Sequence, residues 1–373
     1  MKIAFIGTKG MNFGIDAFGG FETVITELAP RLSREGYEIT VYCRKKLYKT
    51  KEYPSELNGV KLKFLPSIET KNFGTMSHSV LAVLHSIIKG NKVAFLFNLG
   101  LGIYIPLLKL FGVKVITNLD GVEWERSKWG AFAKFMFKLG AYLNVKLADI
   151  IISDAKEIKK IYLQKIGRDS IVIPYGAEIR NDLSSVDIGK FGLVPNSYWL
   201  LSTRFIPENN PLFVIKSFLK TNSNRKLVVL GKNYYNSNYE REIKKINDPR
   251  VLFLGHISNR KMLLEFYKYS YGYIHAHSVG GTNPSMLEAL ANSSCILAHD
   301  NVFNKEMLDN GNYGMFFILD ENDFVNKLHF LENNAQIVEK YKLKAPERIN
   351  NYYNWELVSK KYLETLTLLI RKN

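Results

Sequence analysis

Residues 277–288 combine a glycine pair with the expected start of a helix, a pattern that can bind an anion. A strand pattern ends at His277, and Asn283 and Pro284 follow the glycines. Asparagine is a preferred helix N-cap and proline a preferred first helical residue, so we predict a helix from residue 284. Backbone N–H groups and the helix dipole converge at such a start, and this turn can therefore hold a phosphate.

A diphosphate at this turn would also need a cation, because a helix dipole contributes only about 0.3–1 kcal/mol. Arg204 directly follows the strand pattern of residues 199–202, the first of the second half. A planar guanidinium there can bind phosphate through two hydrogen bonds, which contribute about 1.5–3 kcal/mol. Arg204 is therefore the predicted diphosphate ligand.

Glu288 and the two histidines near it each allow two interpretations. Glu288 lies about one turn inside the predicted helix, where a carboxylate facing a cleft can accept both hydroxyls of a ribose; an exposed helical glutamate fits the spacing equally. His275 and His277 alternate along a strand, so only one of them faces a given side. A structural hydrogen-bonding role suits either histidine, and the neighbouring glycines favour His277 as the one at the site.

The first half of the chain holds a second candidate site. A long glycine-rich loop after residues 3–6 permits close backbone approach to a ligand. The loop is not G-x-G-x-x-G, and the second strand pattern ends in basic residues, which counts against NAD and leaves NADP as an alternative. Asp120 and Glu123 follow the strand pattern of residues 113–117 and are candidates to bind hydroxyls or take a proton. An Asx turn at Asp120 is the alternative.

The elements that must position these residues alternate as short apolar strands and amphipathic helices along all 373 residues. This order predicts an α/β fold with two doubly wound parallel-sheet domains that face a central cleft. We place the first domain at residues 1–178 and the second at residues 179–350. Residues 351–373 are predicted as a C-terminal helix that crosses back to the first domain.

Composition restricts the partners and the setting. A net charge of +16 favours anionic partners such as nucleotides, acidic lipids or nucleic acid. Cys43 and Cys295 have no metal-ligand spacing and fit reduced core thiols of a cytoplasmic protein. The apolar stretches are too short to span a membrane, and the first residues do not form a signal peptide. The chain has no Asp-x-Asp pair, so we expect no metal and no cofactor.

Five segments together resemble the GT4 family of GT-B glycosyltransferases, and more narrowly its bacterial rhamnosyltransferase-like branch that makes capsule and cell-wall polysaccharides. They are residues 18–23, 118–124, 173–177, 204–210 and 280–289. The resemblance implies retaining transfer of a sugar from a nucleoside diphosphate sugar, with the donor held mainly by the second domain.

The resemblance also implies residue roles. Glu288 is similar to the second acid of the family's E-x7-E element, which binds the donor ribose, Arg204 to its diphosphate arginine, and Gly20 to a glycine that approaches the diphosphate. The predicted donor-binding residues are Gly19, Gly20, Arg204, Asn209, His277, Gly281, Thr282, Asn283 and Glu288. The predicted catalytic residues are Asp120 and Arg204, and the predicted acceptor-side residues are Glu22 and Glu123.

The chain departs from the family pattern at three places. Gly280 stands where the first acid of E-x7-E, a contact to the donor sugar, is expected. Asn209 or Asn210 replaces the diphosphate lysine, and Asp120 or a neighbour replaces a first-domain histidine. The role of Asp120 as a general base is therefore open, because in retaining members the donor phosphate is thought to take the acceptor proton.

We predict a metal-independent hexosyltransferase, with dTDP-L-rhamnose as the best single donor and a polyprenyl-diphosphate-linked sugar as acceptor. Residues 127–146 are rich in aromatic residues and lysines, and this helix either lies on the inner face of the plasma membrane or packs half-buried on the sheet. The alternatives are a GT-B-shaped sugar-nucleotide epimerase and a nucleotide- or nucleic-acid-binding protein. No basic stripe with interleaved aromatic residues supports binding of nucleic acid.

Overall fold

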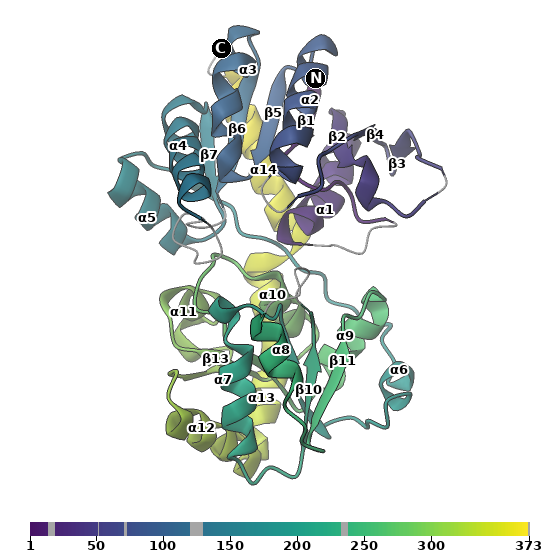
Figure 1. Cartoon of the computed structure of the whole chain (residues 1–373), viewed down its shortest axis with the longest axis vertical. Coiled ribbons are helices and arrows are strands. Elements are labelled where there is room, and N and C mark those ends of the chain that lie inside the picture. Colours follow the sequence, from purple (N-terminus) through teal and green to yellow (C-terminus); the bar gives the residue numbers. More distant parts are fainter. Residues whose placement is uncertain (14–18, 51, 71–72, 120–129, 233–237, 372–373) are drawn as a thin grey trace. The chain divides into compact units, whose positions relative to one another are not determined.

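The computed structural model describes residues 1–13, 19–50, 52–70, 73–119, 130–232 and 238–371 (Figure 1). The chain forms two compact units. One contains Met1–Tyr175 together with Trp355–Asn373, and the other contains Gly176–Asn354. Both are built from parallel strands connected by helices, so the predicted α/β class with two parallel sheets is confirmed.

The first unit has, within the described residues, an eight-stranded sheet in the order β3-β4-β2-β1-β5-β6-β7-β8. All neighbours are parallel except β3 and β4. The strands are β1 (Lys2–Ile6), β2 (Glu38–Arg44), β3 (Glu56–Leu57), β4 (Val60–Leu65), β5 (Val93–Phe97), β6 (Lys114–Leu119), β7 (Ile150–Ser153) and β8 (Ile171–Val172). The helices are α1 (Gly20–Arg34), α2 (Gly74–Ile88), α3 (Ile105–Leu110), α4 (Ala131–Leu147), α5 (Lys156–Ile166) and α14 (Trp355–Arg371), with short helices η1 (Lys45–Leu47) and η2 (Leu99–Tyr104).

The second unit has, in the part of the chain that is described, a six-stranded parallel sheet in the order β11-β10-β9-β12-β13-β14. Its strands are β9 (Tyr198–Ser202), β10 (Lys226–Leu230), β11 (Val251–Gly255), β12 (Gly272–His275), β13 (Ile296–His299) and β14 (Met315–Phe317). Its helices are α6 (Val186–Gly189), α7 (Pro211–Leu219), α8 (Asn238–Lys244), α9 (Arg260–Tyr269), α10 (Pro284–Ala291), α11 (Val302–Met307), α12 (Glu321–Asn333) and α13 (Ala335–Arg348), with shorter η4 (Pro207–Asn209), η5 (Asp309–Gly311) and η6 (Ile349–Tyr353).

Strand order locates the point in each sheet where ligands bind in such folds. The chain leaves β9 toward β10 on one side and later returns to β12 on the other side. This reversal opens a crevice outside the carboxyl ends of β9 and β12. In the first unit, β1 between β2 and β5 is the equivalent point.

The last helix, α14, belongs to the first unit, where Figure 1 shows it in yellow. Tyr362 is buried in that unit, and its hydroxyl accepts a hydrogen bond from the Asn118 side chain at 2.8 Å. Glu356 forms an ion pair of 3.2 Å with Arg31 of α1. The first unit therefore contains two segments of the chain, and the whole second unit lies between them in the sequence.

Helix α4 packs on η2 at backbone distance. A Cβ atom on Gly140 would lie 2.4 Å from the Leu99 carbonyl oxygen, and one on Gly102 would lie 1.9 Å from the Gly140 carbonyl oxygen. The buried Asn144 amide donates to the Leu99 carbonyl oxygen at 2.7 Å and accepts from the Thr117 hydroxyl at 2.8 Å. Only glycine permits this approach. No helix in the described residues is both apolar and long enough to cross a membrane.

We expect Gly140→Ala to lower the free energy of unfolding of the first unit by about 2 kcal/mol or more, because the added methyl group must displace backbone. The matched control is Gly130→Ala at the N-cap of the same helix, where a Cβ meets nothing within 4 Å. Urea unfolding monitored by circular dichroism measures both variants. Equal stability of the two variants would contradict the close packing.

Candidate functional site

The carboxyl ends of β9 and β12 are joined by the turn at η4. Asn210 has a left-handed backbone (φ 54°), and its amide donates to the Ala276 carbonyl oxygen and the Ser278 hydroxyl, both at 2.7 Å. The Ser278 N–H donates to the Glu208 carbonyl oxygen at 2.9 Å. The turn after Arg204 thus fixes the segment that leads into the glycine pair.

Arg204 is exposed at the end of β9, while Asn209 lies beneath it. Asn209 is only 3% exposed, and its amide donates to the Thr203 hydroxyl at 2.9 Å and to the Arg204 carbonyl oxygen at 3.3 Å. Asn209 stays a predicted donor-binding residue. In this structure its amide holds the backbone that carries Arg204.

His277 connects β9 to the start of α10. One ring nitrogen, Nε2, lies 2.8 Å from the Thr203 hydroxyl, and the other, Nδ1, lies 2.7 Å from the Asn283 amide nitrogen. Asn283 is the N-cap of α10 and accepts from the Ser285 N–H at 3.0 Å, which fixes the orientation of its amide. The amide must then donate to Nδ1, so the neutral ring carries its proton on Nε2. His277 therefore fixes the loop with both nitrogens.

Gly280 and Gly281 have no side chains, so this part of the loop can contact a ligand only through its backbone groups. Gly280 has φ 133°, a conformation that disfavours any residue with a Cβ atom. This accounts physically for the absence of an acid at position 280. Gly281 and Thr282 are buried, and Asn301 donates to the His277 carbonyl oxygen at 2.8 Å from the side of α11.

Glu288 lies on α10 with 13% of its side chain exposed, so the exposed-helix alternative is wrong. Its Oε1 accepts from Arg260 Nη1 of α9 at 2.6 Å, and the Arg260 side chain is 43% exposed. Burial raises the pKa of Tyr273 beneath α10, and the Glu288 charge adds to that rise. No sequence pattern predicts Arg260, because a pairing over 28 residues leaves no local spacing signal.

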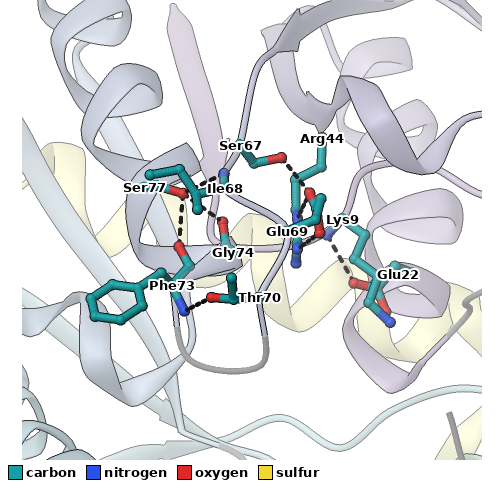
Figure 2. A network of polar contacts seen from close by, with 10 residues as sticks. All are labelled: Lys9, Glu22, Arg44, Ser67, Ile68, Glu69, Thr70, Phe73, Gly74 and Ser77. Atoms are coloured by element: carbon teal, nitrogen blue, oxygen red, sulfur yellow. Dashed lines mark hydrogen bonds and ion pairs between the residues drawn. The ribbon is translucent and has the colours of Figure 1, made fainter. Parts of the chain in front are cut away.

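The predicted first-unit residues Gly19, Gly20 and Glu22 lie at the start of α1, where the Glu22 carboxylate holds the loop after β1 (Figure 2). Glu22 is buried near the start of α1 and accepts from the Lys9 N–H at 2.9 Å. Gly19 is the N-cap of α1, Gly20 is its first residue, and a Cβ on Gly19 would lie 2.8 Å from Glu22 Oε2. Glu22 therefore positions the loop after β1. Asp120 and Glu123 lie outside the described residues.

Figure 2 also shows an ion pair at the ends of β2 and β4. Arg44 Nε donates to Glu69 at 3.1 Å, a second guanidinium nitrogen contacts the same carboxylate, and Ser67 donates to it. Burial opposes the ionisation of Glu69, but the contacts with Arg44 and Ser67 outweigh it and lower the pKa of this carboxyl. Gly74 makes room for the guanidinium, since a Cβ there would lie 2.2 Å from Arg44 Nη2.

Two family models cover most of the chain. Residues 194–350 match "Glycosyl transferases group 1", and residues 1–178 match "Domain of unknown function (DUF1972)". The glycosyl transferases group 1 match therefore falls within the second unit. A comparison with curated protein sequences gave no significant match.

Solved structures similar to this chain share its fold at low sequence identity. Sucrose-phosphate synthase from Thermosynechococcus elongatus has a TM-score of 0.83 at 15% identity, with 100% of both chains covered. HepE of Anabaena in complex with UDP-glucose has a TM-score of 0.77 at 13% identity, with 98% of this chain and 99% of that chain covered. Starch Synthase IV from Arabidopsis thaliana, bound to ADP and acarbose, has a TM-score of 0.76 at 13% identity, covering 98% of each chain. The chain therefore has the GT-B fold of these structures, and residues 194–350 match the glycosyl transferases group 1 model.

We expect Asn283→Ala to lower the free energy of unfolding by about 2 kcal/mol, because it removes the helix cap and leaves His277 Nδ1 without its donor. Asn283→Ser keeps a capping oxygen but not the amide, so its loss should be about half as large. Urea unfolding monitored by circular dichroism compares the two variants. A serine variant as unstable as the alanine variant would contradict the capping role.

Proposed function

We propose that the chain transfers a hexose from a nucleoside diphosphate sugar to a saccharide acceptor. The observation that carries this proposal is the arrangement at the carboxyl ends of β9 and β12. An exposed Arg204, a glycine turn capped by Asn283 and the partly buried carboxylate of Glu288 all belong to the same unit. The Arg204 guanidinium and the start of α10 can bind a diphosphate, and the Glu288 carboxylate can accept hydrogen bonds from the hydroxyls of a nucleoside.

The roles in the reaction follow from this chemistry. The bond between the sugar C1 and the diphosphate oxygen breaks, and a bond forms from C1 to an acceptor hydroxyl oxygen. Arg204 stabilises the negative charge on the leaving diphosphate, and that diphosphate accepts the proton from the acceptor hydroxyl. In this mechanism the sugar keeps its anomeric configuration. Gly19 and Gly20 remain predicted donor contacts, and Asp120 and Glu123 remain predicted on the acceptor side.

The transferred sugar in this proposal is L-rhamnose from dTDP-L-rhamnose, as the resemblance to the rhamnosyltransferase-like branch suggests. HepE binds UDP-glucose and the starch synthase binds ADP, so structures of this fold accept different nucleotides. The proposed acceptor is a polyprenyl-diphosphate-linked sugar used for cell-surface polysaccharide. Such an acceptor requires the enzyme to work at a membrane surface.

The outer face of α4 supports this membrane proposal. Phe135, Leu139 and Tyr142 are exposed at helical spacing, and Lys138 and Lys146 are exposed beside them. The helix contains no acid, and its opposite face is buried against η2. Apolar side chains flanked by lysines fit an anionic lipid surface.

We expect Arg204→Ala and Glu288→Ala each to lower kcat/KM by about tenfold or more, since each loses about 1.4 kcal/mol or more of transition-state binding. The assay follows nucleoside diphosphate release from dTDP-rhamnose and UDP-glucose, with and without a saccharide acceptor and in EDTA, where activity should persist. The control is Glu242→Ala, which removes an exposed carboxylate that forms an ion pair with the exposed Lys216.

Wild-type turnover in both variants would exclude the proposed site. Donor consumption that does not need an acceptor would favour an epimerase over a transferase. Loss of activity in EDTA would contradict the predicted metal independence.

We expect Leu139→Ser combined with Lys138→Glu to weaken binding to phosphatidylglycerol vesicles about tenfold or more, because each basic residue near an anionic surface contributes about 1 kcal/mol. Co-sedimentation with phosphatidylglycerol and phosphatidylcholine vesicles measures the effect. The matched control is Leu343→Ser combined with Lys340→Glu on α13, where both residues are also exposed. Equal vesicle binding by the two double variants would rule out α4 as the membrane contact.

A further inference from the structure

A small cavity lies beneath the glycine pair of the second unit. It has a volume of about 10 Å³ and is lined by His275, His277, Val279, Gly280, Gly281, Asn283, Asn301, Phe303 and Asn304. This volume accommodates one water-sized group, and such a group needs polar partners to be stable there. Most of the lining side chains are polar, so the cavity is suited to a hydroxyl rather than a methyl group.

His275 is the lining residue with an unused polar atom. It is 1% exposed, and its Nε2 has no hydrogen-bond partner among the described residues. The neighbouring ring of His277, with its centroid 4.2 Å away, already uses both nitrogens for Thr203 and Asn283. A buried polar atom without a partner is costly, so a ligand that supplies one gains that free energy.

The contacts on the other side of the ring decide whether Nε2 donates or accepts. Ser285 donates to the capping oxygen of Asn283 at 2.7 Å, so it can accept from the Tyr273 hydroxyl at 3.0 Å. The Tyr273 proton is then used, and its oxygen accepts from His275 Nδ1 at 3.0 Å. The Ser202 carbonyl oxygen, 3.3 Å from the Tyr273 hydroxyl, is a second possible acceptor for the same proton and leads to the same result. In both cases Tyr273 accepts from Nδ1–H, and Nε2 is left as a hydrogen-bond acceptor.

An accepting nitrogen selects the chemistry of its ligand. Burial lowers the pKa of His275 to about 3, so the ring stays neutral at physiological pH. A neutral acceptor repels the oxygens of an ionised diphosphate, which carry lone pairs and no proton. It attracts an O–H group, and a nucleoside diphosphate sugar offers several of these on the sugar, next to the diphosphate.

We propose that His275 recognises the donor sugar, with its Nε2 accepting a hydrogen bond from a hydroxyl that enters the cavity beneath the glycine pair. The inference rests on the proposed function, because it requires a nucleoside diphosphate sugar at this loop. It adds a residue that binds the sugar to the residues proposed for the phosphate and the nucleoside. His275 then discriminates between donors by their hydroxyls and does not contribute to binding of the bare nucleotide.

The test compares two variants of similar size, His275→Asn and His275→Gln. An asparagine amide can replace Nδ1 toward Tyr273 but does not reach the cavity, whereas a glutamine amide can replace Nε2. Isothermal titration of UDP, UDP-glucose, dTDP and dTDP-glucose gives the ratio of Kd values for each nucleotide with and without its sugar. We expect His275→Asn to weaken the sugar nucleotides about five- to tenfold and to leave UDP and dTDP within about twofold. His275→Gln should keep the wild-type ratio.

Tyr273→Phe tests the tautomer argument, because it removes the oxygen that accepts from Nδ1 and so no longer keeps the ring proton away from Nε2. It should weaken the sugar nucleotides and leave UDP and dTDP within about twofold. Equal weakening of nucleotide and sugar nucleotide by His275→Asn would overturn the proposal, and so would no weakening, which would mean that the cavity holds only water. Absence of binding of all four ligands to the wild type would instead reject the proposed function.

A measurement on the unaltered protein guards against a variant that fails to fold. With ¹⁵N-labelled histidine, the His275 Nε2 resonance should move when UDP-glucose or dTDP-glucose is added, and not when UDP or dTDP is added. Identical spectra with and without the sugar would overturn the assignment of His275.

Discussion

Neutral amide side chains hold together the carboxyl edge of the second sheet. Parallel strands β9 and β12 end side by side there, and the backbone groups that follow them need partners. Asn209, Asn210 and Asn301 donate to backbone carbonyl oxygens, and Asn283 donates to the ring of His277. An amide donates and accepts without adding charge, so the loop is fixed while the field of the helix start stays favourable to an anion. A carboxylate in these positions would oppose that field.

The first unit fixes its loops in a different way, with charged side chains. The buried carboxylate of Glu22 accepts the Lys9 N–H, and the buried guanidinium of Arg44 is paired with Glu69, which also accepts from Ser67. A buried charge is tolerated only when it is paired, and removal of its partner is strongly destabilising. Such contacts specify one loop geometry. On the proposed function the second unit holds the diphosphate, and Gly19 and Gly20 of the first unit stay predicted backbone contacts to it.

The features that the sequence predicts correctly are those set by residues close to one another along the chain. Alternating apolar runs predicted the two parallel sheets, and Asn283 with Pro284 predicted the start of α10, because caps and periodicity act within a few residues. The sequence did not predict that Asn209 faces inward, because that follows from a contact with Thr203 inside the folded turn. Nor did it predict the pair of Arg260 with Glu288 or the contact of Gly140 with Leu99, which join elements that only the tertiary fold brings together.

The lysine of the resembling family is expected at Asn209 or Asn210, and both residues use their amides to hold the loop. Asn209 is 3% exposed and donates to Thr203 and to the Arg204 carbonyl oxygen, and Asn210 donates to the Ala276 carbonyl oxygen and the Ser278 hydroxyl. A lysine that reached outward to a diphosphate would not make these contacts. On the proposed function, Arg204 and the start of α10 bind the diphosphate in the described part of the second unit. Their contributions to its binding free energy are about 1.5–3 and 0.3–1 kcal/mol respectively. The net charge of +16 raises the encounter rate with an anion more than the lifetime of the complex. The nucleoside and the sugar must therefore supply much of the donor affinity, and in such a site the groups that contact them control which donor is used.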